Sequence, residues 1–295
     1  MALRLATRGS KLALAQAGAV AKLLDDAELV EASSDGEPGD KSRFVRAVER
    51  ELLEGRADIG VHSAKDLPAA LPEGLVIAGV PARETAEDAW LGKGSTLDGV
   101  PERSTVGTSS LRRRAQLLAR RPDLEVVELH GNVDTRLKRL KGRKTLDAIV
   151  LAAAGLGRLG REKDISFLLP AGQMTPAAGQ GALALQTRED DAEAREAVAA
   201  ISDGTALVEL TAERAAVAAM DASCNTPIGI YARRDGDRLT IDGFAGLPDG
   251  SIWVRDRFEG DADDPRALGE ELAKRMVAAG AGHVLQMAEE QVAQS

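Results

Sequence analysis

Aromatic side chains are scarce in this chain, which has 295 residues of which only 2% are Phe, Trp or Tyr. The core must therefore be aliphatic, built from Leu, Val, Ile and Ala. The scarcity also removes the stacking platforms on which single-stranded nucleic acids bind. The formal net charge is −9, which does not favour nucleic acid or an acidic membrane surface. We expect neither as a partner.

Cysteine and long apolar runs are also nearly absent. Cys224 is the one cysteine, so an intramolecular disulfide is excluded, which fits a reducing compartment. No apolar run reaches the roughly 18 to 20 residues of a membrane span, and the first residues lack the apolar segment of a signal peptide. These features lead us to expect a cytoplasmic protein without membrane contact.

Metal and nucleotide signatures are missing as well. His62, His130 and His283 lie far apart in the sequence and lack metal-ligand spacing, so we expect no metal site. The chain has no glycine-rich phosphate loop of the Walker type and no dinucleotide-binding fingerprint. Function must therefore be sought in the charged and polar turns.

Strands and helices alternate over the first two thirds of the chain. Apolar or alternating runs predict strands at 3–7, 28–32, 57–61 and 75–80, and helical spacing predicts helices at 11–25 and 42–53. This order is typical of a parallel α/β sheet. The run 89–91 is where a crossing to a second domain begins. A second block of strands, turns and helices follows up to residue 158, and the length fits two or three domains.

The last third has a different pattern. A helix is predicted at 207–220, antiparallel strands at 228–233, 239–245 and 252–258, and a closing helix at 265–279. Cys224 lies near the start of this α+β block. A lone cysteine is usually an inert small hydrophobe, but the loop around Cys224 is polar, which favours exposure.

One turn carries charge at the end of a buried strand. After the apolar run 57–61 the chain presents Ser63, Lys65 and Asp66 in quick succession, and Pro68 prevents a helix from beginning there. Ligands of open α/β sheets bind at the carboxyl ends of strands. A surface turn with two solvated charges is the alternative interpretation.

Further cationic turns follow in the second block. Near 107–114 a strand end and a tight turn lead into a helix, where Ser109 or Ser110 can cap and Arg112 and Arg113 supply forks for carboxylates. Later turns carry Arg136 and Arg158. Such repetition indicates a ligand with several carboxylates or phosphates. A nucleic-acid patch is the alternative for the arginines at 112–121, and the acidic balance disfavours it. For Arg114, Arg120 and Arg121 we expect a solvated helix face.

Seven motifs together resemble one known family. In chain order they are RLATRGS (4–10), HSAKDLP (62–68), GTSSLRR (107–113), GNVDTR (131–136), AGLGRLG (154–160), GQGA (179–182) and CNTPIG (224–229). Each motif alone is weak. Their joint order and spacing over nearly the whole chain are similar to those of porphobilinogen deaminase, also called hydroxymethylbilane synthase.

The resemblance implies a fold and a domain organisation. The fold class it implies is α/β, with two lobes like those of periplasmic binding proteins and a smaller C-terminal α+β domain with an antiparallel sheet. The expected domains are 1–82 with 180–200, then 86–176, then 204–295. The site is expected in the cleft between the first two.

The same resemblance implies a reaction and a cofactor. A dipyrromethane, assembled from two substrate molecules, is joined by a thioether to a loop cysteine, and here only Cys224 can serve. Four porphobilinogens are added head to tail, each losing ammonia, and water releases 1-hydroxymethylbilane. Because each pyrrole carries an acetate and a propionate, the growing chain accumulates carboxylates. The implied protein is a cytoplasmic monomer of tetrapyrrole (porphyrin, heme) biosynthesis.

Site residues are carried over by their match to the motifs. Asp66 matches the catalytic aspartate, whose carboxylate stabilises positive charge on the attacking pyrrole and shuttles protons. The expected cofactor-binding residues are Cys224, Ser63, Lys65, Thr108, Ser110, Arg112, Arg113 and Gln180. The expected substrate-binding residues are Arg8, Ser10, Arg136 and Arg158.

Three positions depart from the family pattern. His130 stands where an arginine usually precedes Gly-Asn, so one carboxylate contact is lost unless His130 is protonated. Residues 33–41 form a shorter loop than the usual mobile lid, and we assign no lid role to Lys41 or Arg43. Residues 221–223 replace a glycine pair before the cysteine.

Two other functions compete with the enzyme. One is a two-lobed anion-binding or sensor protein without chemistry, and ammonia release with pyrrole consumption distinguishes it. The other is a nucleic-acid binder, which would show salt-sensitive retention of DNA or RNA.

Overall fold

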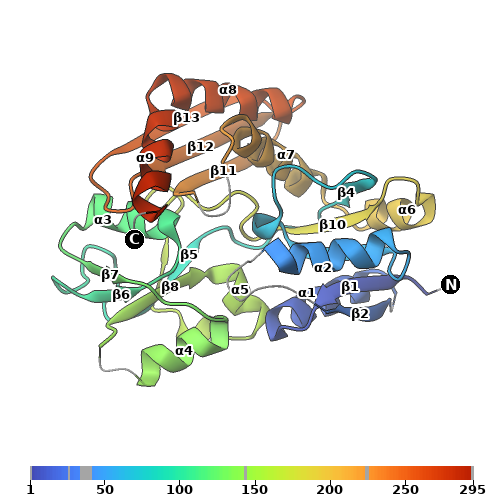
Figure 1. Cartoon of the computed structure of the whole chain (residues 1–295), viewed down its shortest axis with the longest axis horizontal. Coiled ribbons are helices and arrows are strands. Elements are labelled where there is room, and N and C mark those ends of the chain that lie inside the picture. Colours follow the sequence, from blue (N-terminus) through green and yellow to red (C-terminus); the bar gives the residue numbers. More distant parts are fainter. Residues whose placement is uncertain (1, 26, 34–41, 143–144, 223–225, 294–295) are drawn as a thin grey trace.

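The computed structural model describes residues 2–25, 27–33, 42–142, 145–222 and 226–293. The predicted loop at 34–41 and the cysteine at 224 lie outside these residues. The described chain forms three sheets, two of five strands and one of three. In Figure 1 the first sheet lies on the right, in blue, teal and yellow, the second lies at the lower left, mostly in green, and the third lies above both, in orange.

The first lobe contains a mixed sheet in the order β2-β1-β3-β10-β4. Its strands are β1 (Arg4–Arg8), β2 (Glu28–Ala32), β3 (Ile59–Ser63), β4 (Leu75–Gly79) and β10 (Leu183–Arg188). Its helices are α1 (Lys11–Leu23), α2 (Ser42–Leu53) and α6 (Ala192–Ala200). The first three strands are parallel, as predicted, but β10 runs antiparallel to both of its neighbours. An all-parallel sheet was therefore the wrong expectation.

The second lobe repeats this arrangement in the order β7-β6-β8-β5-β9. Its strands are β5 (Asp88–Gly92), β6 (Thr105–Gly107), β7 (Glu125–Val127), β8 (Ala148–Ala152) and β9 (Phe167–Leu169). Its helices are α3 (Leu111–Arg120), α4 (Val133–Gly142) and α5 (Ala153–Arg158), and a short 3₁₀ turn follows at Glu162–Asp164. The run 89–91, expected to begin a crossing, is a fully buried strand of this sheet.

The third unit is an antiparallel sheet covered by helices. Its strands are β11 (Ile228–Asp235), β12 (Arg238–Gly246) and β13 (Trp253–Asp261), and its helices are α7 (Gly204–Ala219), α8 (Pro265–Ala278) and α9 (Ala281–Ala293). Aspartates begin two of the helices: Asp203 accepts from the amide of Ala206, and Asp264 from that of Ala267. Aliphatic side chains such as Ile230, Ile241 and Leu272 form its core.

Two crossing segments, residues 80–87 and 170–182, connect the lobes. They lie side by side, since the amide of Glu84 donates to the carbonyl of Gly181. The predicted fold class is confirmed: two α/β lobes and a smaller α+β unit with an antiparallel sheet. Among the described residues, no helix is both long and apolar enough to span a bilayer.

Candidate active site

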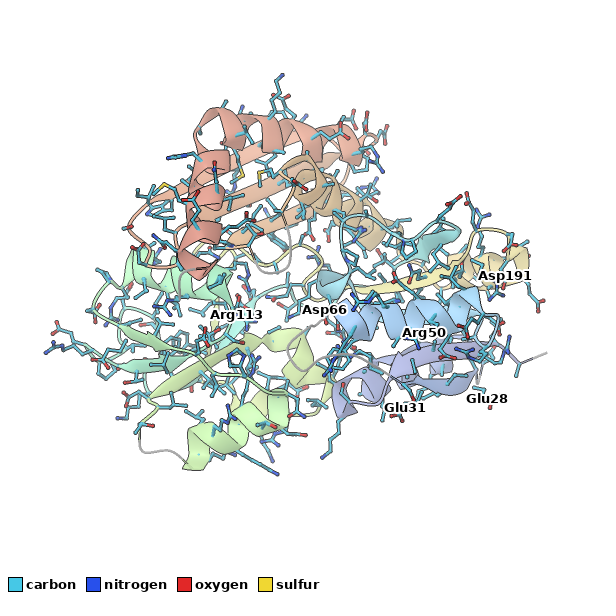
Figure 2. The ribbon with its side chains drawn as sticks, viewed as in Figure 1. Glu28, Glu31, Arg50, Asp66, Arg113 and Asp191 are labelled. Atoms are coloured by element: carbon cyan, nitrogen blue, oxygen red, sulfur yellow. The ribbon has the colours of Figure 1, made fainter. Side chains whose placement is uncertain are left out.

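Asp66 lies on a tight turn at the carboxyl end of β3. The strand ends at Ser63, and residues Ala64–Asp66 form one turn of 3₁₀ helix, closed by the amide of Leu67 donating to the carbonyl of Ala64. Leu67 is extended, as expected for a residue before proline. The Asp66 side chain is 46% exposed, and Figure 2 shows it where the first lobe meets the rest of the molecule. Its carboxylate is therefore available to a ligand.

Arg8 is the cation nearest to Asp66. Its Nη1 lies 3.7 Å from Oδ2 of Asp66, and its guanidinium stacks 4.0 Å above the ring of Phe44. Burial lowers the pKa of Arg8, and the nearby Asp66 only partly compensates. The Nε atom is buried without a hydrogen-bond partner among the described residues. Ser10 lies behind it and caps α1 by accepting from the amide of Ala13 at 3.2 Å.

Lys65 points the other way, towards Gln180 of the second crossing segment. Its Nζ lies 3.4 Å from Oε1 of Gln180. Burial, with a smaller effect of Arg113, lowers the pKa of Lys65 to about 8, although Asp66 and Asp88 act in the opposite direction. No carboxylate lies within 4 Å of the ammonium in the described part of the chain. Lys65 is thus a poorly compensated cation.

Asp88, which the sequence did not single out, organises the arginine pair of α3. Its carboxylate is fully buried, with Oδ2 accepting from Nη1 of Arg112 at 2.8 Å and Oδ1 from Nε of Arg113 at 3.0 Å. The same Oδ1 accepts from Nε2 of Gln180 at 3.0 Å. Burial would raise the pKa of Asp88, but the two guanidiniums hold it well below its ordinary value.

Arg112 and Arg113 are therefore less available than a helix start on the surface suggested. They are 4% and 6% exposed, and each also donates to a backbone carbonyl, of Thr175 and Val150 respectively. The sequence held one signal for Asp88, which is that an aspartate begins an otherwise apolar strand. Because a buried charge needs a partner, such an aspartate predicts a nearby cation. Two cations on one carboxylate leave a net positive charge at this point.

Thr108 and Ser110 shape the turn before α3. The hydroxyl of Thr108 accepts from the amide of Ser110 at 3.2 Å, and Ser110 accepts from the amide of Arg113. The sequence left open whether Ser109 or Ser110 caps this helix, and the structure shows that Ser110 does. Arg121, at the other end of α3, was expected on a solvated face but donates to the carbonyls of Leu97 and Val100.

Arg136 and Arg158 bring further positive charge to the same region. Arg136 donates to Oγ of Ser109 at 3.1 Å, and burial, helped by Arg113, lowers its pKa to about 10. Arg158 donates to the carbonyl of Gly181 at 2.7 Å, and burial lowers its pKa also. Neither arginine has a carboxylate within 4 Å among the described residues.

The remaining predicted positions vary in exposure. Ser63 is half-buried and exchanges hydrogen bonds with Gln16 of α1, at 2.8 and 3.2 Å. Gln180 is fully buried. His130 is exposed and lies 2.9 Å from Glu128, and His62 is buried, which lowers its pKa to about 4. Cys224 is outside the described residues, so its placement is not described.

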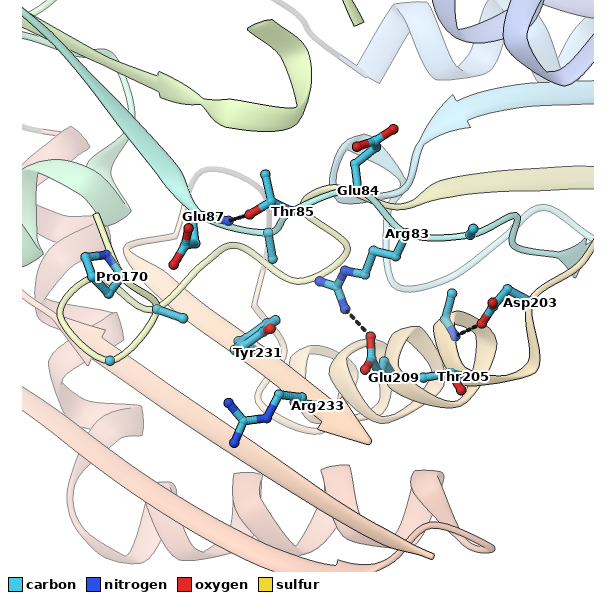
Figure 3. A pocket seen from close by; sticks show the side chains of 15 residues that line it. Arg83, Glu84, Thr85, Glu87, Pro170, Asp203, Thr205, Glu209, Tyr231 and Arg233 are labelled. Carbon is cyan, nitrogen blue, oxygen red and sulfur yellow. Dashed lines mark hydrogen bonds and ion pairs between the residues drawn. The ribbon is translucent and has the colours of Figure 1, made fainter. Parts of the chain in front are cut away.

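A cavity of about 770 Å³ lies apart from this turn. Its walls are the first crossing segment, residues 170–172, the start of α7, and Tyr231 and Arg233 of β11 (Figure 3). Asp66 is not part of its lining. The cavity therefore lies between the third unit and the crossing segments, and its lining does not include the residues of the cationic region.

The cationic region fits a group that carries several carboxylates. Lys65, Arg136 and Arg158 are desolvated cations with no carboxylate within 4 Å in the described part, although Asp66, Asp88 and Glu84 act on two of them from farther away, and Arg8 has one at 3.7 Å. A cation held in a partly buried place without a counterion is costly, and a bound carboxylate offsets that cost. Asp66 is the one exposed carboxylate on the β3 turn.

Comparison with known proteins agrees with this chemistry. Residues 3–196 match the family described as porphobilinogen deaminase, dipyromethane cofactor binding domain, and residues 207–278 match the porphobilinogen deaminase C-terminal domain. A curated porphobilinogen deaminase of Brevibacillus brevis is 41% identical over 299 residues, which cover 96% of each chain. That of Lysinibacillus sphaericus is 45% identical over 250 residues, covering 84% of this chain and 80% of the relative.

The solved structures that the chain matches are more distant. A lipoprotein of the YaeC family from Enterococcus faecalis is 16% identical, with a TM-score of 0.38, over 69% of this chain and 91% of that one. The family matches and the curated relatives span nearly the whole chain. On these matches, the chain belongs to the porphobilinogen deaminase family.

Proposed function

We propose that Asp66 is the catalytic carboxylate of this chain, in a cleft whose cations bind the carboxylates of substrate and cofactor. The reaction is that of the family: four porphobilinogens are joined head to tail with release of four ammonia, and water releases 1-hydroxymethylbilane. One observation carries the proposal. Asp66 is exposed, with Nη1 of Arg8 at 3.7 Å, whereas the carboxylate of Asp88 is fully buried under two guanidiniums.

The chemistry requires a carboxylate that is free to respond. When ammonia leaves porphobilinogen, the remaining ring is electron-poor, and the pyrrole that attacks it gains positive charge. An exposed carboxylate beside the pyrrole nitrogens stabilises that charge and accepts the proton that is then lost. Asp88 cannot do this, because Arg112, Arg113 and Gln180 already occupy its oxygens.

The cations supply binding and orientation. The dipyrromethane, when bound, supplies the pyrrole end on which the product chain is built. Lys65, Arg112, Arg113 and the polar Ser63, Thr108, Ser110 and Gln180 are the residues that we assign to holding it, with Cys224 as its covalent anchor. Arg8, Ser10, Arg136 and Arg158 are assigned to the incoming substrate. Several of these cations have a lowered pKa or no carboxylate close by. They therefore favour ligands that carry carboxylates over neutral ligands.

We further propose that the enzyme is a cytoplasmic monomer that binds no nucleic acid. The single cysteine, which excludes an intramolecular disulfide, supports the compartment. The net charge of −9 and the scarcity of aromatics disfavour nucleic acid. A binding protein without chemistry remains the competing function, and turnover decides between them.

The test is ammonia release by the Asp66→Asn variant. We expect normal folding and cofactor mass, and a loss of turnover of roughly 10²-fold or more, as for removal of a general acid–base group. Asp66→Glu, which keeps the charge, is the matched control and should retain part of the rate. Full turnover by Asp66→Asn contradicts the assignment.

Intact mass tests the anchor separately. The wild-type chain should exceed the mass of its polypeptide by one dipyrromethane, located by peptide mapping on Cys224. The Cys224→Ala variant should show the bare mass even after porphobilinogen is added. Covalent pyrrole mass on that variant would assign the anchor to another residue.

A further inference from the structure

Arg214 of α7 reaches across from the third unit to the turn that carries Asp66. Its Nη2 donates to the carbonyl of Pro68 and to that of Ala69, both at 2.9 Å. The side chain is half-buried, and burial lowers the pKa of Arg214. In the described part of the chain no carboxylate lies within 4 Å of it. The interactions of the guanidinium are therefore with two main-chain carbonyls.

These carbonyls follow Leu67, which packs in a buried cluster with Leu210 of α7, and their own segment has few main-chain hydrogen bonds among the described residues. Pro68 has no amide hydrogen, so it cannot donate to a neighbouring strand. The turn itself is closed by one backbone hydrogen bond, from Leu67 to Ala64 at 3.2 Å. A hydrogen bond from a charged donor is stronger than one between neutral groups. Arg214 is therefore well suited to fix the exit of the turn.

The residue next to Arg214 holds the other side of the same turn. Glu213 is fully buried, and its Oε2 accepts from the amide of Gly179 at 2.6 Å. Gly179 packs directly on the turn, since a Cβ on it would lie 2.8 Å from the carbonyl carbon of Ala64 and 2.9 Å from the amide nitrogen of Lys65. Two consecutive residues of one helix thus act on both sides of the turn.

Glu213 is in turn fixed by charge. Its Oε1 accepts from Nη1 of Arg83 and from the amide of Ala232, both at 2.8 Å. Arg83 also donates to the carbonyl of Gln180 and to Glu209, and Figure 3 shows it pointing from the crossing segment towards α7. The helix is therefore anchored to the crossing segments and to β11 at the level of Arg214.

We propose that Arg214 is a positioning residue for the reaction. By binding the carbonyls of Pro68 and Ala69, it holds Asp66 at a fixed position relative to α7. The inference rests on the proposed role of Asp66. Helix α7 ends at Ala219, only a few residues before Cys224 in the chain. The turn that carries Asp66 is thereby tied to α7.

The test compares Arg214→Gln with a matched control, Arg234→Gln. Arg234 also belongs to the third unit and donates to a turn carbonyl, that of Gly236 at 2.8 Å, but it is remote from Asp66. For Arg214→Gln we expect normal cofactor mass, a KM for porphobilinogen within about twofold of wild type, and a kcat lower by about tenfold, because small misplacements of a reacting group are costly. Arg214→Lys should recover part of the kcat, and Arg234→Gln should leave it unchanged.

A double variant checks the route of the effect. If Arg214 acts through Asp66, then Arg214→Gln should not slow the residual reaction of Asp66→Asn any further. An additional loss in that background overturns the inference, as does an Arg214→Gln variant with a lower unfolding temperature but an intact kcat. If Asp66→Asn keeps its turnover, the proposed function fails instead, so the two failures are distinguishable.

Discussion

Two aspartates near the β3 turn differ in how fully their charge is matched. Asp88 is buried and faces Arg112 and Arg113, which hold its pKa low and fix it as an anion. Asp66 is 46% exposed and has Arg8 at 3.7 Å. The first is built as a fixed support for two guanidiniums, and the second is left free to meet a developing positive charge.

Lys65 gives a prediction about pH. Its ammonium has a pKa lowered from about 10.5 to about 8, so it is lost as the pH rises through about 8. Cofactor loading, which needs a cation there, should weaken above that pH in the wild type. Lys65→Arg should keep loading to higher pH, because a guanidinium stays protonated.

The measurement is the rate at which cofactor-free protein gains pyrrole mass from porphobilinogen at several pH values. The two proteins differ at residue 65 alone, so the ratio of the two rates at each pH isolates Lys65. Coinciding pH profiles would exclude a role for its charge in loading.

The second crossing segment matters at the scale of whole elements because it packs on the turn that carries Asp66 without space for a side chain. Gly179 has φ +71°, and a Cβ there would lie 2.8 Å from Ala64. The contact is backbone on backbone, so neither side can give way by rotating a side chain. Crossing segment and turn therefore have to move together.

Gly179→Ala should disturb the turn more than the fold. We expect a kcat reduced by about tenfold and a loss of stability of about 1 to 3 kcal/mol, from the strained φ and the close contact. Ammonia release and urea unfolding measure the two. Gly204→Ala, at the first residue of α7 with open space around it, is the control and should leave the rate unchanged. A Gly179→Ala variant with normal kcat would show that the turn tolerates displacement.

Several elements could be predicted from the sequence because local patterns determine them. Helix α2 and strand β2 have the predicted bounds, Ser42–Leu53 and Glu28–Ala32. The direction of β10 could not be predicted, because it depends on which strands it joins after a long excursion through the second lobe. Register between distant strands has no local signal.

The site could be predicted in part for the same reason. The motifs pointed to Asp66 and to the cationic turns. In the structure, Oε1 of Gln180 lies within hydrogen-bonding distance of both Lys65 and Arg112. Asp88 was missed, because its partners lie 24 and 92 residues away. The interactions of Arg214 with Pro68 and Ala69, 146 and 145 residues away, were equally invisible.

The whole molecule concentrates desolvated cations despite its acidic total. Burial lowers the pKa of Arg8, Lys65, Arg113, Arg136 and Arg158. Each lowered pKa means that the folded protein disfavours the charged form at that position. Without bound carboxylates, this group of charges therefore opposes folding.

Cofactor loading should consequently stabilise the fold. We expect the loaded protein to unfold at a temperature several degrees above that of unloaded wild type and of Cys224→Ala. Added salt should raise the midpoint of the unloaded forms more than that of the loaded form, because salt screens repulsion among cations. Thermal unfolding at low and high salt measures both effects. Equal midpoints for loaded and unloaded protein would contradict this account.

The scarcity of aromatic residues has an optical consequence. The chain has two tryptophans: Trp90 is fully buried in the second lobe against Phe167, and Trp253 is half exposed at the start of β13. The first lobe, with the Asp66 turn, contains none. Intrinsic fluorescence therefore divides into a shielded, blue-emitting signal and a hydrated, red-shifted one, so that two separate parts of the molecule can be followed without any attached dye.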